Sequence, residues 1–464
     1  MKRFKLFILA IAAVAFSCEE QLEIPPVDSL DAGSVFETVD DLEVGMNGLY
    51  ALFDPEDIIR HSSIFTDQTK IGADNGGQQV TLHNWIVDPG SNSGGIWGNH
   101  YATVALSNRI IEAAEAITPE TGDETTRYNR IIAEAQTWRA YAHFILLAAY
   151  APDYDAATLG VPYVKEVVVL QQPARNTVGE CFAEIKADLA AANASLPANG
   201  VDRWSQDAVT ALLARVALYE GDNATALNLS SALVTSYPLA DRTQYVEAFQ
   251  DLSNTEMIFK MVKTQADAPR SGGIWYFTGT GGAFIEMSKG FYDIIDPADV
   301  RSDVLIDQAN TDDAQNLHFI GKYLGKDGFN FLNDYKIFRS GEMQLIRAEA
   351  QAKSGDLNGA AASVKALRDA RYGAAQALPN YPNLAAAITD ILVERRLELG
   401  FEGHRWLDIK RTNSITLFGL QRDTADCGGG GTPCNLDIND QRWAIAIPAA
   451  EIDANPNMVQ NPGY

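Results

Sequence analysis

Two polar, aromatic-rich segments contain the side chains best suited to hold a ligand without reacting with it. They span residues 67–99 and 271–284 and lack regular hydrophobic periodicity. Flat aromatic rings can stack on the apolar faces of a ligand, while amides and carboxylates hydrogen-bond its polar groups. The ligand-binding candidates are Asp67, Asn75, Gln78, Trp85, Trp275, Tyr276 and Phe277. The alternative is structural: the tryptophans would pin their loops to the core, and the polar residues would form turns.

The stretch from residue 394 to residue 408 has the composition of a catalytic centre, with carboxylates, arginines and His404 close together. Asp408 and Arg411, however, stand at helical i,i+3 spacing. Charges arranged in this way usually pair with one another on neighbouring helices. We therefore expect an architectural ion-pair network here.

The chain lacks the sequence patterns of common catalytic sites. It has no nucleophile elbow, His-Glu-x-x-His helix, phosphate-binding loop or dinucleotide-binding glycine motif. Its histidines, at positions 61, 83, 100, 143, 318 and 404, are not spaced as metal ligands. We expect a protein that is not an enzyme and that has no cofactor and no metal.

Helical periodicity dominates the elements that must position the two loop segments. One predicted helix face comprises Phe182, Ile185, Leu189, Ala192 and Leu196, and Pro197 stops it. A second comprises Trp138, Ala142, Ile145, Leu146 and Ala149, in a helix that ends near Pro152.

Two helical segments also resemble each other. Residues 212–226 and 345–360 each contain an Ala- and Leu-rich helix, a Gly-Asp turn and a second helix that begins with a small residue. This is the pattern of tetratricopeptide (TPR) repeats, in which small residues let two helices approach closely.

The N-terminus has the features of an export leader that ends at a cysteine. Lys2, Arg3 and Lys5 precede an apolar run at residues 6–16, which is too short to span a membrane. We predict that residues 1–17 are a cleaved signal peptide and that Cys18 is lipidated. The alternative is an ordinary exported protein with a free Cys18.

The net charge of the chain limits the kinds of ligand that it can bind. The formal net charge of −25 repels nucleic acid and other polyanions, so a neutral ligand is favoured.

Cys427 and Cys434 flank a glycine-rich tract, where a loop-closing disulfide is favoured over a metal-binding pair. Cys181 falls in a helical pattern and is expected to be buried.

Several motifs in a fixed order give this chain a family resemblance. They are Phe36 with Asp41-Leu42 and Asn47-Gly48-Leu49-Tyr50, Trp97 with Tyr101 and Asn108, Glu134 with Trp138-Arg139-Ala140-Tyr141, Ile346-Arg347-Ala348-Glu349-Ala350, Glu394-Arg395-Arg396-Leu397-Glu398-Leu399, Phe401-Glu402-Gly403-His404-Arg405-Trp406, and the ending Gln460-Asn461-Pro462-Gly463-Tyr464. With this set the chain resembles the SusD/RagB family, the surface glycan-binding lipoproteins of Bacteroidetes. Trp97, Trp138 and Trp406 lie within these motifs and are expected to pack in the core.

The resemblance implies a mostly α-helical fold, in which four TPR-like helix pairs pack against an irregular, loop-rich half that binds ligand. It implies a single domain over residues 18–464 that begins with a short linker, residues 18–35. It also implies an outer-membrane lipoprotein at the cell surface, a position for which Glu19 and Glu20 resemble the export signal. The expected partners are an oligosaccharide and a SusC-type TonB-dependent transporter to which the sugar is delivered.

Two alternatives remain open. The cargo could be peptides, as in the RagB branch of the family, which would favour backbone pairing and mixed pockets over flat aromatic platforms. A protein of another class, a TPR scaffold that only braces a membrane complex, would have no ligand site at all.

Overall fold

The computed structural model describes residues 35–90, 94–167, 170–266, 271–277, 279–427 and 431–464. The predicted signal peptide, Cys18 and nearly all of the predicted linker lie outside these residues. None of the helices within the described ranges combines the length and the apolar character needed to cross a bilayer.

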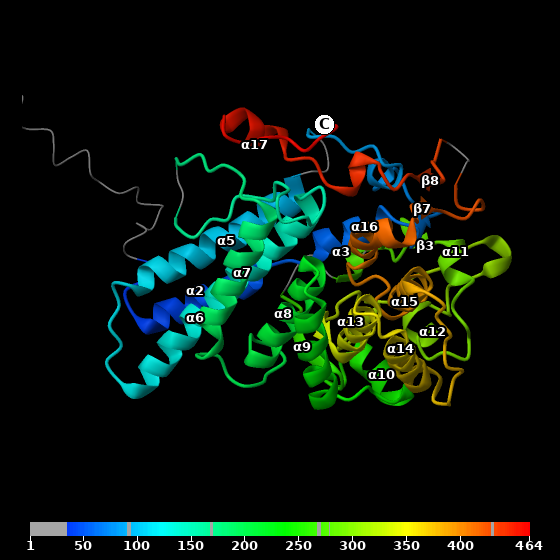
Figure 1. The fold of residues 1–464 in the computed structure, drawn as a ribbon, viewed down its shortest axis with the longest axis horizontal. Coiled ribbons are helices and arrows are strands. Elements are labelled where there is room, and N and C mark those ends of the chain that lie inside the picture. The colour runs from blue at the N-terminus through cyan, green and yellow to red at the C-terminus, as the bar shows by residue number, and fades with distance from the viewer. Residues whose placement is uncertain (1–34, 91–93, 168–169, 267–270, 278, 428–430) are drawn as a thin grey trace, which may run out of the picture.

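The fold is mostly α-helical, as predicted (Figure 1). The α-helices are α2 (Val39–Leu52), α3 (Glu56–Ile64), α4 (Val80–His83), α5 (Gly94–Ala114), α6 (Gly122–Tyr150), α7 (Val178–Asn193), α8 (Gln206–Glu220), α9 (Asn223–Ser236), α10 (Arg242–Phe249), α11 (Lys289–Tyr292), α12 (Ser302–Leu305), α13 (Ser340–Lys353), α14 (Leu357–Tyr372), α15 (Leu384–Glu398), α16 (Arg405–Thr416) and α17 (Ala449–Ala454). Three short 3-10 helices are η2 (Ser271–Ile274), η3 (Asp313–Gln315) and η4 (Gln441–Trp443).

The strands are short and antiparallel. They are β1 (Thr69–Ile71), β2 (Met257–Met261), β3 (Ile285–Met287), β4 (Gly325–Lys326), β5 (Phe329–Asn330), β6 (Tyr335–Arg339), β7 (Leu420–Gln421) and β8 (Asn435–Leu436). In the part of the chain that the structure describes, they form the two-stranded sheets β1–β3, β2–β6, β4–β5 and β7–β8. Each sheet therefore fastens two segments together rather than forming a layer of its own.

The two similar segments each form a helical hairpin, α8–α9 and α13–α14. Gly221 and Gly355 adopt left-handed conformations (φ 83° and 88°), which turn the chain after the first helix. The next residue, Asp222 or Asp356, caps the second helix by accepting a backbone hydrogen bond from the third residue beyond it. The hairpins lie side by side, with α13 against α9, in the lower half of Figure 1. The assignment of these pairs to the TPR class stays a prediction.

The predicted helix faces are buried. In α7, Phe182, Ile185, Leu189 and Ala192 are all buried. Leu196 is buried too, but it lies beyond the end of that helix. In α6, the predicted face from Trp138 to Ala149 is buried, and the helix ends at Tyr150.

The charged stretch around α15 and α16 is an ion-pair network, as expected. Arg395 pairs with Asp408 at 2.7 Å, and Asp408 also pairs with Arg411 at 2.7 Å. Glu394 pairs with Arg301 at 2.6 Å, and all four of these side chains on α15 and α16 are buried. These groups hold helices together and face one another rather than a cleft.

The cysteines also lie as expected. Cys427 and Cys434 form a disulfide that closes the loop between β7 and β8. Cys181 is free and buried in α7, and burial raises the pKa of its thiol to about 11. A thiol in that state is a packing residue.

Candidate functional site

Strand pairing between β1 and β3 brings the two loop segments together. Thr69 lies opposite Met287, and Ile71 lies opposite Ile285. The hydrogen-bonded contact continues past the strands, because the Gly72 amide donates to the Phe284 carbonyl at 3.1 Å. A side chain at Gly72 would collide with the Ala283 carbonyl, so this close approach requires glycine. The two segments, which are about 200 positions apart in the chain, are therefore joined in the fold.

Asp67 does not face a ligand. Its carboxylate is buried and accepts two hydrogen bonds from Arg405, at 2.9 and 2.8 Å, while Arg396 lies 3.4 Å away. Burial alone would raise the pKa of Asp67, but the two guanidinium groups outweigh it and hold the pKa well below its usual range. Its role as a hydroxyl partner on the surface is wrong; Asp67 anchors the first loop segment to α15 and α16.

Asn75 is a buried clamp between the two segments. Its amide nitrogen donates to the Phe284 carbonyl at 2.7 Å and to the Gln78 carbonyl at 2.6 Å. Its side-chain oxygen accepts from the Gly77 amide at 2.9 Å. The hydrogen-bonding capacity of Asn75 is therefore committed to the turn, which is the structural alternative noted above.

Gln78 has the position that a ligand-binding residue requires. Its side chain is exposed at the tip of the turn that Asn75 holds. The side-chain amide has no hydrogen-bond partner within the described ranges of the chain. Gln78 is thus free to bind a hydroxyl group.

Trp85 is not the exposed platform that we expected. Its side chain is only 2% exposed, its indole N–H donates to the Phe65 carbonyl at 2.7 Å, and the Arg422 guanidinium lies 4.2 Å from the ring centroid. The backbone of Trp85 is left-handed (φ 57°), a conformation that its buried ring holds in place. The indole fixes the end of the first loop segment.

Trp275 and Tyr276 are buried as well. The Trp275 ring is fully buried and stacks on Tyr323, with centroids 5.6 Å apart. The Tyr276 ring stacks on Phe331 at 4.9 Å, and its hydroxyl donates to the Ile320 carbonyl at 2.6 Å. The expectation that these two rings are open to solvent is wrong.

Phe277 is the aromatic candidate that remains accessible. Its ring is half-buried and packs on Phe284, with centroids 5.1 Å apart. Asp74, Gln78 and Thr280 are exposed in the same two segments. We call Asp74, Gln78, Phe277 and Thr280 the loop face.

All seven tryptophans of the chain are buried. Long loops without regular structure lose much conformational entropy on folding, and a buried indole provides a large compensating apolar contact. The same glycine-rich, aromatic composition that suggests an open binding loop therefore also suits a loop that is pinned to the core.

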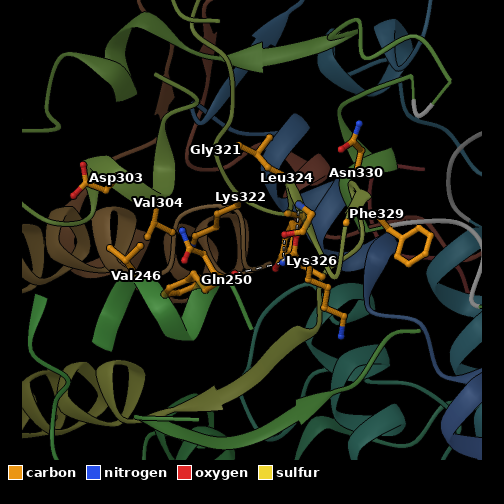
Figure 2. Close-up of a pocket in the computed structure, with 15 residues that line it drawn as sticks. Val246, Gln250, Asp303, Val304, Gly321, Lys322, Leu324, Lys326, Phe329 and Asn330 are labelled. Atoms are coloured by element: carbon orange, nitrogen blue, oxygen red, sulfur yellow. Dashed lines mark hydrogen bonds between the residues drawn. The ribbon is translucent and has the colours of Figure 1, made fainter. Parts of the chain in front are cut away.

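A polar cavity that was not expected from the sequence lies beside the β4–β5 hairpin (Figure 2). It has a volume of about 390 Å³ and lies between α10, α12 and residues 321–333. Gly321, Gly325 and Gly328 stand close together in this last segment, among aromatic residues. That glycine spacing was the signal available in the sequence.

One wall of the cavity is Lys322, whose side chain is buried. Its ammonium group pairs with Glu402 and lies 4.7 Å from the centroid of the Phe249 ring. Burial lowers the pKa of Lys322 to about 8 although Glu402 opposes this shift. On the rim, Gln250 and Asp303 are exposed.

A second cleft, of about 560 Å³, lies between α5 and α17. Trp97 and Tyr101 line it, but Trp97 is buried against Tyr150, as expected for a packing residue. Among the residues that the structure describes, no group of three or more His, Cys, Asp or Glu side chains is arranged to hold a metal ion.

The structure is that of a helical protein in which helical hairpins pack against an irregular half. That half contains the loop face and the polar cavity beside the β4–β5 hairpin. A family described as "SusD family" matches residues 308–464, and one described as "Starch-binding associating with outer membrane" matches residues 34–218. The chain belongs to the SusD/RagB family.

Individual relatives are similar to this chain over nearly its whole length. It is 26% identical to the SusD-like protein P2 of Formosa agariphila, with all of both chains covered. A SusD superfamily structure from Bacteroides thetaiotaomicron has a TM-score of 0.79 at 24% identity and covers 92% of this chain and 100% of its own. A putative sugar binding protein from Bacteroides vulgatus has a TM-score of 0.78 at 25% identity and covers 93% of this chain and 100% of its own.

Proposed function

We propose that this protein binds neutral oligosaccharides at the bacterial cell surface and passes them to a transporter without breaking a bond. The observation that carries the proposal is the loop face. Two segments joined by a hydrogen bond between Asn75 and Phe284, 209 positions apart, present the exposed Gln78 on one segment and the half-buried Phe277 on the other. Family membership supports the ligand class, because a structure of similar fold is described as a "Putative sugar binding protein".

The loop face has suitable chemistry for a sugar. Phe277 provides an apolar ring, while Gln78, Asp74 and Thr280 provide hydrogen-bonding groups at the surface. The loop face contains a single half-buried ring, so the contact of each sugar unit contributes little binding free energy. The affinity for an oligosaccharide must therefore come from several weak contacts. The formal net charge of −25 favours neutral over anionic glycans.

The cellular setting follows from the leader and from the family. We propose that Cys18 is lipidated and holds residues 18–464 on the outer membrane as one domain, facing the outside. A SusC-type TonB-dependent transporter is the proposed receiver of the sugar. Outer-membrane association is supported by the family description that matches residues 34–218.

Affinity electrophoresis of the full chain through gels that contain neutral polysaccharides tests the proposal. Gln78→Ala and Phe277→Ala should each weaken retention about fivefold, because each removes a contact that contributes about 1 kcal/mol. Thr243→Ala is the matched control, since Thr243 is exposed on α10, a helix that contributes no residue to the loop face.

The outcomes separate the alternatives. Unchanged retention in a double variant of Gln78 and Phe277 would remove the loop face from the binding site. Retention of peptides and of no glycan would favour a RagB-like cargo. Shortened oligosaccharides after incubation with pure protein would contradict binding without catalysis.

A further inference from the structure

The cavity shown in Figure 2 is a separate feature from the loop face. Its walls come from the C-terminal end of α10, from α12 and from the segment with the β4–β5 hairpin. The loop face instead lies in the residues that follow β1 and precede β3. A volume of about 390 Å³ is near the lower end of the range for small-molecule sites. The cavity therefore suits a ligand of one or two rings.

The backbone around the cavity is strained. Tyr323 and Phe331 have left-handed conformations, both with φ of 63°, and both side chains are buried. Such conformations cost about 1–3 kcal/mol each and persist where the surroundings enforce them, often at binding sites. A side chain at Gly325 would collide with the Phe329 carbonyl across the hairpin, so this wall also needs its glycine.

The aromatic cluster of the second loop segment holds this strained wall in place. Trp275 stacks on Tyr323, and Tyr276 stacks on Phe331. The residues first expected to contact a ligand thus support the cavity from behind. Residues buried as supports in this way give a cavity that is preformed, which lowers the entropic cost of binding.

Polar groups with unused hydrogen-bonding capacity border the cavity. The Lys322 ammonium has three protons, and within the described ranges Glu402 is its one oxygen acceptor. The side chains of Gln250 and Asp303 make no hydrogen bond with the described residues. Phe249, Val246 and Val304 supply apolar surface between them.

The balance of charge points to a neutral ligand. Of the cations that line the cavity, Lys322 pairs with Glu402 and Lys326 pairs with Asp334. Asp303 adds an unpaired negative charge at the rim. An anionic ligand would be repelled by the Asp303 carboxylate, and both lysines that line the cavity are already paired with carboxylates.

We propose that this cavity is a second saccharide pocket, which holds one or two neutral sugar units between Gln250, Asp303 and Lys322. The ligand class in this inference rests on the proposed function. The inference adds a second binding site, separate from the loop face, for the end of a glycan chain or for a disaccharide. Apolar ring faces would lie on Phe249 and the aliphatic wall, and hydroxyls would hydrogen-bond the polar rim.

Isothermal titration of the full chain with neutral disaccharides of glucose, galactose, mannose and xylose tests the pocket. We expect saturable binding of at least one disaccharide and a loss of at least tenfold in affinity in the double variant Gln250→Ala/Asp303→Ala. Glu247→Gln is the matched control, because Glu247 is on α10 but does not line the cavity.

Thermal unfolding followed by circular dichroism confirms that each variant is folded. Unchanged affinity in the double variant, or no disaccharide bound by the native chain, would overturn the pocket. If polysaccharide retention persisted in that case, the loop face and the proposed function would stand. Disaccharide binding lost in Gln78→Ala but not in the double variant would move the ligand to the loop face.

Discussion

The carboxylate of Asp67 lies between two guanidinium groups on helices that are more than 300 positions away in the chain. Both Arg405 and Asp67 are buried, so each charge has lost most of its hydration. Such a pair is costly to break, since removing one partner leaves the other charge buried and unpaired. At the residue scale, Asp67 is therefore a structural anchor whose loss should release the base of the first loop segment.

Asp67→Asn should lower the free energy of unfolding by about 3–5 kcal/mol at neutral pH. The pKa of Asp67 is lowered from 3.8 in the folded protein, so its contribution is present above about pH 4 and is lost as the pH falls through the folded-state pKa. The difference between native protein and variant should shrink below about pH 4. Denaturant unfolding at pH 7 and at several acidic pH values measures both effects.

Asp74→Asn is the control for Asp67→Asn, because Asp74 is exposed in the same loop segment. We expect a change in unfolding free energy of less than about 0.5 kcal/mol for this exposed position. Equal effects of the two substitutions would contradict the anchoring role of Asp67.

At the scale of elements, the disulfide-closed hairpin β7–β8 braces the first loop segment. The backbone amide of Arg422 donates to the Cys434 carbonyl at 2.8 Å, and the Arg422 side chain lies over Trp85 and donates to the Phe65 carbonyl at 3.2 Å. The Cys427–Cys434 disulfide restricts the loop that follows this arginine. Through Arg422, the folded state of the β7–β8 hairpin thus helps to keep Trp85 buried.

The double variant Cys427→Ser/Cys434→Ser should unfold with a free energy about 2 kcal/mol lower, since a short loop regains freedom in the unfolded chain. Denaturant titration with and without dithiothreitol measures this effect. The reductant should destabilise the native protein by the same amount and leave the double variant unchanged. A native protein indifferent to reductant would contradict a stabilising disulfide.

Other elements follow directly from local sequence. The faces of α6 and α7 were predicted because apolar residues recur at the helical period, and each such face must be covered by another element. The Gly-Asp turns of the two hairpins were recognised as a pattern shared by two segments, and they form because glycine tolerates a left-handed conformation and aspartate caps a helix. These rules depend on neighbours within a few positions.

At the scale of the whole molecule, the proposed lipid anchor and the net charge bear on where the protein would work. The formal net charge of the full chain is −25, and the proposed leader contains three basic residues and no acidic one, so the proposed lipid at Cys18 would hold a strongly acidic domain at a membrane surface. Several acyl chains are needed for a stable anchor, and a single cysteine-linked lipid of the bacterial type supplies them. A negatively charged domain would bind neutral glycans without strong competition from polyanions.

Cys18→Ser should abolish incorporation of labelled fatty acid and move the protein from the outer-membrane fraction to the soluble fraction. Fractionation and immunoblotting of bacterial cells that express each form measure the change. Ser17→Ala is the control because it alters the neighbouring residue and keeps the thiol. A serine variant that stays in the membrane fraction would contradict anchoring through Cys18.

The sequence by itself determined the helical class, the two helical hairpins, the ion-pair character of the 394–408 stretch and the family, because these depend on local periodicity and on ordered motifs. It also indicated which two segments are irregular. Only the tertiary structure decided which of their side chains face solvent. Burial of Trp275 depends on Tyr323, and that of Trp85 depends on Arg422, partners that lie far away in the chain. Loop composition does not encode such contacts, since the same aromatic ring can either pin a loop or receive a sugar.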